Sequence, residues 1–119
     1  MFECKFPRQS NAADFIYTVH VENKTTGSAY DLTDAVIYLS LDGPRRCSGI
    51  TANSADGSEI VSVLDPATDG DIAIVIPADR FKNLIPDIYC LGLLMVEGDQ
   101  KTQILLSELP IVEGLPKWL

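Results

Sequence analysis

Alternation of apolar and polar side chains along the first half of the chain predicts short β-strands. Residues 15–22 alternate with a period of two and are rich in aromatic and β-branched side chains before the turn NKTTG. Residues 35–41 repeat this pattern and end at Asp42-Gly43-Pro44, where Gly and Pro favour a turn and Pro denies a ladder hydrogen bond. Residues 47–51 and 59–64 are shorter candidate strands, separated by the turn sequence ANSADG.

The second half continues with stronger patterns. In DIAIVIP the three isoleucines form one stripe and Pro77 ends the pairing, which predicts a strand. ADRFKNL predicts one or two helical turns, with Phe81 and Leu84 facing inward, before Pro86 forbids continuation. Residues 88–96 and 101–107 flank EGDQ and predict a β-hairpin. Residues 109–112 extend or follow its second arm, and Pro110 indicates an edge or a bend.

Together these patterns predict an all-β sandwich of about seven short strands with one short helical turn. We divide the chain into an N-terminal arm at 1–13, a sandwich domain at 14–113 and a C-terminal tail at 114–119. Residues 91–96 are apolar on both faces of the expected strand. We therefore expect one face to pack in the core and the other to pack against another molecule, such as another subunit.

Composition restricts the classes of partner. The chain has 119 residues, 46% of them apolar, which suits one folded domain. Its apolar runs are far shorter than the ~20 residues that span a bilayer, and the start MFECKFPRQSN lacks the pattern of a secretory signal, so we expect the chain to stay in the cytosol. The net charge of -8 repels phosphate backbones and anionic lipids, which argues against nucleic acid and membrane partners.

The cysteines do not indicate a metal site. Cys4, Cys47 and Cys90 are widely spaced, and the chain has no CxxC motif and a single histidine. Cys90 alternates with Ile88 and Gly92 in an apolar run, which predicts a buried thiol. Cys4 and Cys47 fall in segments that we expect to be exposed, and an inter-subunit disulfide through one of the three cysteines stays open.

No residue pattern indicates catalysis or cofactor binding. His20 shares its strand face with Thr18 and Glu22, which is typical of a solvated face. The acidic residues of DPATDGD lack the spacing of a calcium loop, so Asp65, Asp69 and Asp71 are interpreted as solvated turn acids. Phosphate-binding, zinc-protease and nucleophile-elbow motifs do not occur. We predict a non-enzyme without a metal or cofactor.

Apolar residues outside the predicted sandwich are candidate interface residues. Phe2 and Phe6 lie among charges in the N-terminal arm, and Leu115, Trp118 and Leu119 lie in the tail GLPKWL. Trp buries a large area at a low cost in side-chain entropy, so it is common at interface anchors. The alternative is that the tail folds back to cover its own sandwich.

The order of these motifs resembles small immunoglobulin-like domains of tailed-bacteriophage structural proteins, notably the N-terminal domain of baseplate upper proteins. In that group a D-L-[TS]-x-[AY]-x-[VI] segment leads into a strand, and here Asp31-Leu32-Thr33-Asp34-Ala35-Val36-Ile37 stands in that place. A later D-x-x-Y-x-[AV]-x-[LV] strand precedes a hairpin with a polar tip. Here Asp87-Ile88-Tyr89-Cys90-Leu91-Gly92-Leu93 stands in that place, with Tyr89 two positions after Asp87 instead of three. The resemblance spans residues 15–112. A Gly is common where this chain has Asp34.

The resemblance implies an immunoglobulin-like fold and a non-enzymatic virion subunit, made in the host cytoplasm and built into the neck, tail, baseplate or capsid surface. Its partners would be copies of itself and other virion proteins. A carbohydrate- or protein-binding sandwich module is the alternative, and an enzyme or inhibitor is the third hypothesis. A sugar platform needs two or three coplanar aromatic side chains, whereas Tyr17, Tyr38 and Tyr89 are expected to be buried inside strands.

Overall fold

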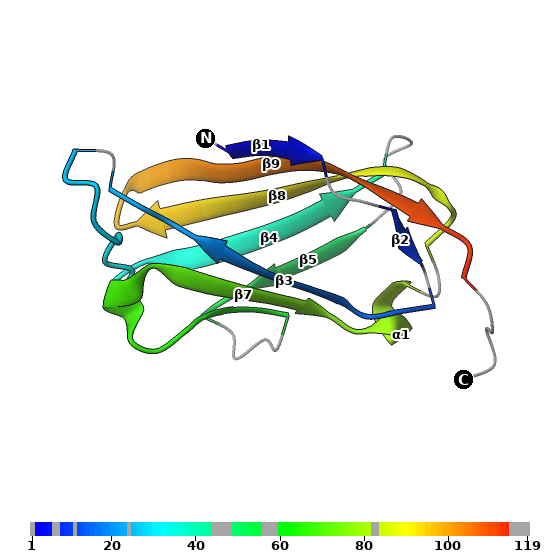
Figure 1. Ribbon diagram of the computed structural model, residues 1–119, viewed down its shortest axis with the longest axis horizontal. Helices are drawn as coiled ribbons and strands as arrows, with labels where there is room; N and C mark the ends of the chain where they lie inside the picture. The colour runs from blue at the N-terminus through cyan, green and yellow to red at the C-terminus, as the bar shows by residue number, and fades with distance from the viewer. Residues whose placement is uncertain are drawn as a thin grey trace.

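Two β-sheets make up most of the computed structural model and pack against each other around a shared apolar core (Figure 1). The structure describes residues 2–5, 8–10, 12–23, 25–43, 49–55, 60–81 and 84–114, with the backbone alone for 2–5. The predicted all-β class is confirmed for this part of the chain. The predicted short helical turn is also present, as α1 (Ala78–Phe81).

The large sheet has the order β1-β9-β8-β4-β5, with the short β2 also paired to β9. The small sheet has the order β3-β7-β6. Neighbouring strands are antiparallel except that β1 and β2 run parallel to β9. The strands of the large sheet are β1 (Phe2–Lys5), β2 (Gln9–Ser10), β4 (Val36–Asp42), β5 (Ile50–Asn53), β8 (Asp87–Glu97) and β9 (Gln100–Val112). Those of the small sheet are β3 (Phe15–His20), β6 (Val61–Val63) and β7 (Asp71–Ile76). The 3-10 turn η1 (Ala67–Asp69) lies between β6 and β7.

The core consists of the inward positions of both sheets, as the period of two requires. On β8, Leu91, Leu93 and Met95 are buried, and on β7 the three isoleucines have no exposed surface. Phe81 of α1 and the nearby Leu84 are buried as well, so α1 closes one end of the sandwich as predicted. The prediction that one face of residues 91–96 packs in the core is therefore confirmed.

The hairpin predicted around EGDQ is β8 and β9, which turn at Gly98 with a φ of 58°. Pro110 lies within β9 rather than at a free edge, because β9 has β8 on one side and the N-terminal strands on the other. On the N-terminal side, β1 pairs with β9 up to Glu108 and β2 pairs from Ile111. The missing N–H of Pro110 thus falls in the interval between β1 and β2, where no ladder bond is needed.

The N-terminal arm contains two strands that its aperiodic sequence did not predict. Backbone 2–5 and residues 9–10 pair in parallel with β9 of their own chain. Short parallel pairing of this kind depends on a distant partner strand, so local alternation carries no signal for it. Residues 1–13 are therefore partly integrated into the large sheet, and contact with a neighbouring subunit stays a prediction.

Asp31-Leu32-Thr33 forms a turn that anchors the entry to β4. The Asp31 carboxylate accepts hydrogen bonds from the Thr33 N–H and hydroxyl, and the Ala35 N–H donates to the Leu32 carbonyl. Leu32 is 1% exposed, and its N–H donates to the carbonyl of Ala67 in η1. The polar residues of this segment thus set the turn that points one leucine into the core.

Tyr89 joins the start of β8 to the connection that precedes it. Its ring is 2% exposed, and its hydroxyl donates to the Ile85 carbonyl at 2.9 Å. A buried phenol needs a partner for its hydroxyl, and here the partner is backbone four residues upstream. This hydrogen bond fixes the path of the chain as it crosses from the small sheet to the large one.

Candidate functional site

The large sheet has an outer face, which we define as the face turned away from the small sheet. Side chains on β4, β8 and β9 that alternate with the buried ones point to this face. Strand register places them in rows across the three strands. The rows are Tyr38–Leu94–Gln103, Ser40–Gly92–Leu106 and Asp42–Cys90–Glu108, with Ile88 and Pro110 beyond them.

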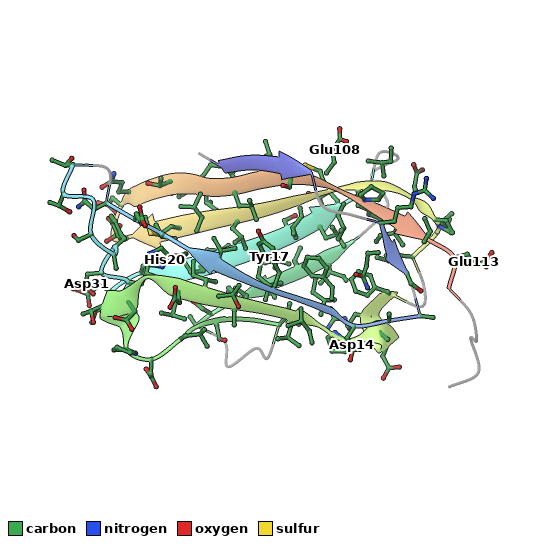
Figure 2. All side chains as sticks on the ribbon, in the orientation of Figure 1. Asp14, Tyr17, His20, Asp31, Glu108 and Glu113 are labelled. Carbon is green, nitrogen blue, oxygen red and sulfur yellow. The ribbon has the colours of Figure 1, made fainter. Side chains whose placement is uncertain are left out.

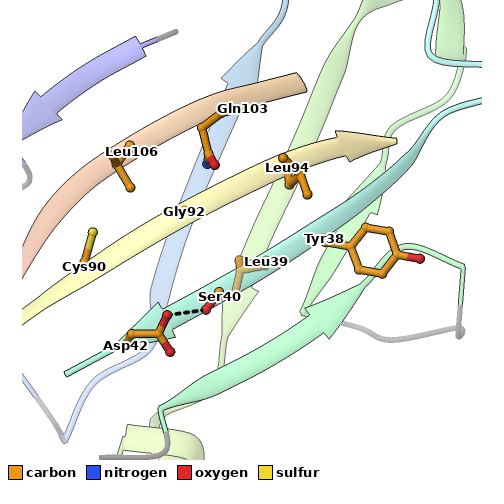
Figure 3. Close-up of a pocket in the computed structure, with 9 residues that line it drawn as sticks. All are labelled: Tyr38, Leu39, Ser40, Asp42, Cys90, Gly92, Leu94, Gln103 and Leu106. Atoms are coloured by element: carbon orange, nitrogen blue, oxygen red, sulfur yellow. Dashed lines mark hydrogen bonds between the residues drawn. The ribbon is translucent and has the colours of Figure 1, made fainter. Parts of the chain in front are cut away.

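The centre of the outer face is apolar and hollowed. Figure 3 shows Leu94 and Leu106 on either side of Gly92, with Tyr38 on the neighbouring strand. These residues line an open depression of about 300 Å³. Tyr38 is 44% exposed and Leu106 is 39% exposed, so water contacts apolar surface that belongs to a regular sheet. Large contiguous apolar surfaces mark contacts with other molecules, so this surface is a candidate contact site.

A β-bulge sets the shape of the depression. The register of β8 on β9 shifts between Leu93 and Leu94, and the Gln103 amide donates to the carbonyls of Leu93 at 2.9 Å and Leu105 at 2.7 Å. A Cβ on Gly92 would lie 3.3 Å from the Gln103 Nε2. Gly92 therefore gives the Gln103 side chain room to bridge the bulge, which leaves a hollow beside Leu106.

One end of the outer face is acidic. Asp42 and Glu108 flank Cys90 in the same row, and the Ser40 hydroxyl donates to the Asp42 carboxylate at 2.8 Å. Figure 3 shows this contact at the end of β4. The backbones of β4 and β9 lie two strand spacings apart, about 10 Å, so the two carboxylates create a negative edge beside the apolar centre. The arrangement favours a partner surface that is apolar in the middle and carries Arg or Lys at one side.

Cys90 is exposed on this face, so the prediction of a buried thiol is wrong. Its neighbours Tyr89 and Leu91 take the inward positions instead, at 2% and 0% exposure. The apolar run containing Cys90 has two apolar faces, and sequence alone does not say which of them is the core face. Its thiol lies in the row with Asp42 and Glu108.

Two of the three tyrosines expected inside strands are also exposed. Tyr17 is 39% and Tyr38 is 44% exposed, whereas Tyr89 is buried as predicted. Tyr17 belongs to β3 of the small sheet and stacks on Phe15 with ring centroids 6.3 Å apart, and Tyr38 lies on the outer face of the large sheet. The two exposed rings are therefore on different surfaces and do not form a shared platform for a sugar.

His20 is not an isolated polar residue. Its Nδ1 lies 2.7 Å from the Asp71 carboxylate and its Nε2 lies 3.6 Å from that of Glu22, on the exposed side of the small sheet (Figure 2). Asp71 is thus paired with histidine, while Asp65 and Asp69 are exposed. Within the described residues, no cluster of three or more His, Cys, Asp or Glu side chains is arranged to hold a metal ion.

Two ionisable groups near the start of β4 are perturbed by hydrogen bonds. The pKa of Tyr30 is raised, first by its hydrogen bond to the Glu97 carboxylate and then by burial and nearby negative charge. The pKa of Asp31 is lowered by the hydrogen bonds from the Thr33 hydroxyl and N–H. Both shifts belong to contacts that stabilise a loop, and neither group lies in the depression.

The interface residues predicted from sequence lie outside the part of the chain whose side chains are described. These are Phe2, for which the backbone alone is described, and Phe6, Leu115, Trp118 and Leu119. The outer face contains instead residues that sequence reasoning did not single out, among them Leu106 and Gln103. The sequence indicated this face only through residues 91–96, which are apolar on both faces of their strand. That pattern identifies β8 as part of the outer face but does not identify the residues of β9 beside it.

No model of a known protein family matches the chain, and no curated protein matches its sequence. No helix in the described part of the chain combines the length and apolar character needed to cross a membrane.

Proposed function

We propose that this chain is a non-enzymatic structural subunit of a bacteriophage particle, built on an immunoglobulin-like sandwich, that binds another protein chain through its outer face. The observation that carries the proposal is the apolar surface of Tyr38, Leu94 and Leu106 across adjacent strands. Removing such a surface from water stabilises a contact by about 25 cal/mol per Å². The assignment to a phage particle is supported by the sequence resemblance of residues 15–112, and it places the chain in the virion after synthesis in the host cytoplasm.

Strand order supports the immunoglobulin-like part of the proposal. Immunoglobulin sandwiches place their B, E and D strands in one sheet and C, F and G in the other, with an added strand beside C in some types. The order β3-β7-β6 and the order β9-β8-β4-β5 correspond to these two sets in chain sequence. The hydrogen bond from Tyr89 to Ile85 has the geometry of the tyrosine corner at the start of the F strand.

The alternative is a binding module for carbohydrate. Tyr38, Ser40 and Asp42 at the depression offer one ring and two polar groups. A sugar platform uses two or three coplanar rings, and the other exposed tyrosine, Tyr17, lies on the small sheet. Among the described residues, the apolar area around Leu94 and Leu106 suits a protein surface better than a hydroxyl-rich ligand.

The test replaces Leu106 with Glu. Because Leu106 is 39% exposed, the variant is expected to fold with a melting temperature close to that of the native chain. In an interface, the new carboxylate would be buried without a partner, which costs ~2 kcal/mol or more and predicts a loss of incorporation of at least about 10-fold. Leu64→Glu is the matched control, since Leu64 is equally exposed at 39% and lies after β6 of the small sheet.

The measurement is the amount of each variant in purified particles from cells infected by a phage that encodes it. Native chain and Leu64→Glu should be present in equal amounts, and Leu106→Glu should be depleted. Absence of the native chain from particles would overturn the virion assignment. Full incorporation of Leu106→Glu would overturn the outer face as the contact surface.

A further inference from the structure

Strand β3 is an open edge of the small sheet. Within the described chain the sheet order is β3-β7-β6, so β3 has a neighbour on one side only. Figure 1 shows β3 running along β7 at the front of the molecule. Open strands present unpaired main-chain groups that can bind a further strand.

The ladder identifies which groups face the open side. Val75 donates to the Ile60 carbonyl at 2.8 Å and Leu64 donates to the Asp71 carbonyl at 2.9 Å, so odd-numbered residues of β7 bond to β6 and its flanks. Even-numbered residues of β7 therefore bond to β3, where their partners are Phe15, Tyr17 and Val19. It follows that Ile16, Thr18 and His20 direct their main-chain N–H and C=O groups away from β7.

This edge lacks the features that usually prevent strand addition. Residues 15–20 contain no Pro and no Lys, and they pair with β7 in six consecutive positions without a bulge. Ile16 is 71% exposed, and Tyr17 is 39% exposed beside it. Edge strands in proteins are commonly shortened, bulged or charged to avoid pairing with another chain. The edge of β3 is regular instead, and its exposed side chains are the apolar Ile16 and Tyr17 together with the polar Thr18 and His20.

We propose that β3 pairs antiparallel with β3 of a second copy of this chain, across a two-fold axis at Thr18, to form a continuous six-stranded sheet. In this register Ile16 faces His20 of the second copy and Thr18 faces its equivalent. All three outward residues of each strand then enter hydrogen-bonded pairs, which gives about six main-chain hydrogen bonds. An axis at Tyr17 would leave His20 opposite Asp14, beyond the end of the partner strand.

Side-chain chemistry favours a second copy as the partner. The register centred on Thr18 sets Tyr17 opposite Val19 and Thr18 opposite Thr18, and both aromatic with β-branched and Thr with Thr pairs stabilise antiparallel strands. β3 has no Asp or Glu, so pairing brings no carboxylates together within the strands of a chain with a net charge of -8. Just beyond the strand ends Glu22 would face Asp14, a like-charge contact that dissolved salt screens. The pairing involves the small sheet, whereas the outer face belongs to the large sheet. A negative result for one of the two proposals therefore does not contradict the other.

The first experiment measures the oligomeric state of the purified chain by sedimentation over a wide range of concentration and of sodium chloride. We expect a monomer–dimer equilibrium that strengthens as salt rises. Thr18→Pro removes the N–H that faces the open edge and leaves the ladder to β7 intact, so it should raise the dimer dissociation constant at least 10-fold. Thr18→Val keeps the N–H and should dimerise like the native chain.

A second experiment tests the register without depending on the stability of a proline variant. In a background with Cys4, Cys47 and Cys90 changed to Ser, Thr18→Cys should form a disulfide-linked dimer on mild oxidation, because equivalent residues in this pair have Cα atoms about 5.5 Å apart. Ile16→Cys should not, because it faces His20. A chain that stays monomeric at every concentration and salt level, or equal cross-linking by both variants, would overturn the proposal.

Discussion

The hydrogen bond between Tyr89 and Ile85 offers a direct test of how the two sheets are joined. Tyr89→Phe removes the hydroxyl that donates to the Ile85 carbonyl at 2.9 Å and keeps the ring, which is 2% exposed in the core. The packing of the aromatic ring is therefore unchanged, and the loss of stability measures the hydroxyl alone.

The expected magnitude follows from the surroundings of the two partners. A neutral hydrogen bond contributes about 1 kcal/mol to folding, and an acceptor left buried without a partner costs up to about 3 kcal/mol. Ile85 is 66% exposed, so water reaches the freed carbonyl and the lower figure applies. For a chain of 119 residues the unfolding entropy is roughly 0.25 kcal/mol per degree, so the melting temperature should fall by about 4 °C.

The assay is urea denaturation followed by circular dichroism, with thermal melting as a second measure. The slope of the free energy against urea should not change, because the surface exposed on unfolding is the same. Tyr38→Phe is the matched control: Tyr38 is 44% exposed on the outer face, and the same atom is removed. Equal stability of Tyr89→Phe and Tyr38→Phe, or a loss for Tyr89→Phe well above 3 kcal/mol, would refute this account of the crossing between the sheets.

Two further predictions concern the loops at the other end of the sandwich. Gly70→Ala should destabilise the chain by more than about 2 kcal/mol, because Gly70 has a φ of 71° and a Cβ there would lie 2.5 Å from the Val21 carbonyl oxygen. The control is Gly27→Ala, which has the same φ and nothing within 4 Å of the new Cβ, and which should cost only about 1 kcal/mol. Equal losses of stability for the two variants in urea denaturation would contradict the predicted clash at Gly70. Thr33→Val should move the pKa of Asp31 up toward its ordinary value, since the Thr33 hydroxyl is the main cause of the lowered pKa. Because the pKa of Asp31 is lower in the folded than in the unfolded chain, its ionised carboxylate stabilises the native chain at pH values above the unfolded-state pKa. This stabilisation is lost as the pH falls through the folded-state pKa, so the native chain and the variant should converge in stability in acid. An unchanged carboxyl titration of Asp31 by NMR would contradict this assignment.

The sequence alone determined the strand content of the chain and much of its order. Alternation in residues 15–22, 35–41 and 71–76 predicted β3, β4 and β7, because one face of each strand must be apolar to form a core. Turn residues at Gly98 and the pair Phe81 and Leu84 before Pro86 likewise predicted the last hairpin and the short helix α1. These features depend on local dihedral preferences and burial, which the chain encodes residue by residue.

Tertiary structure decided which face of each strand lies in the core and which strands pair with each other. Residues 91–96 are apolar on both sides, so only packing against the small sheet makes Leu91 and Leu93 core residues and leaves Cys90 outside. The two N-terminal strands exist because β9 has a free side for them, and the exposure of Tyr17 follows from the place of β3 at the end of its sheet. The bulge that brings Gln103 over Gly92 arises from the register of β8 on β9. Each of these depends on residues distant in sequence, and for that reason the candidate site was visible in the sequence only as one strand with two apolar faces.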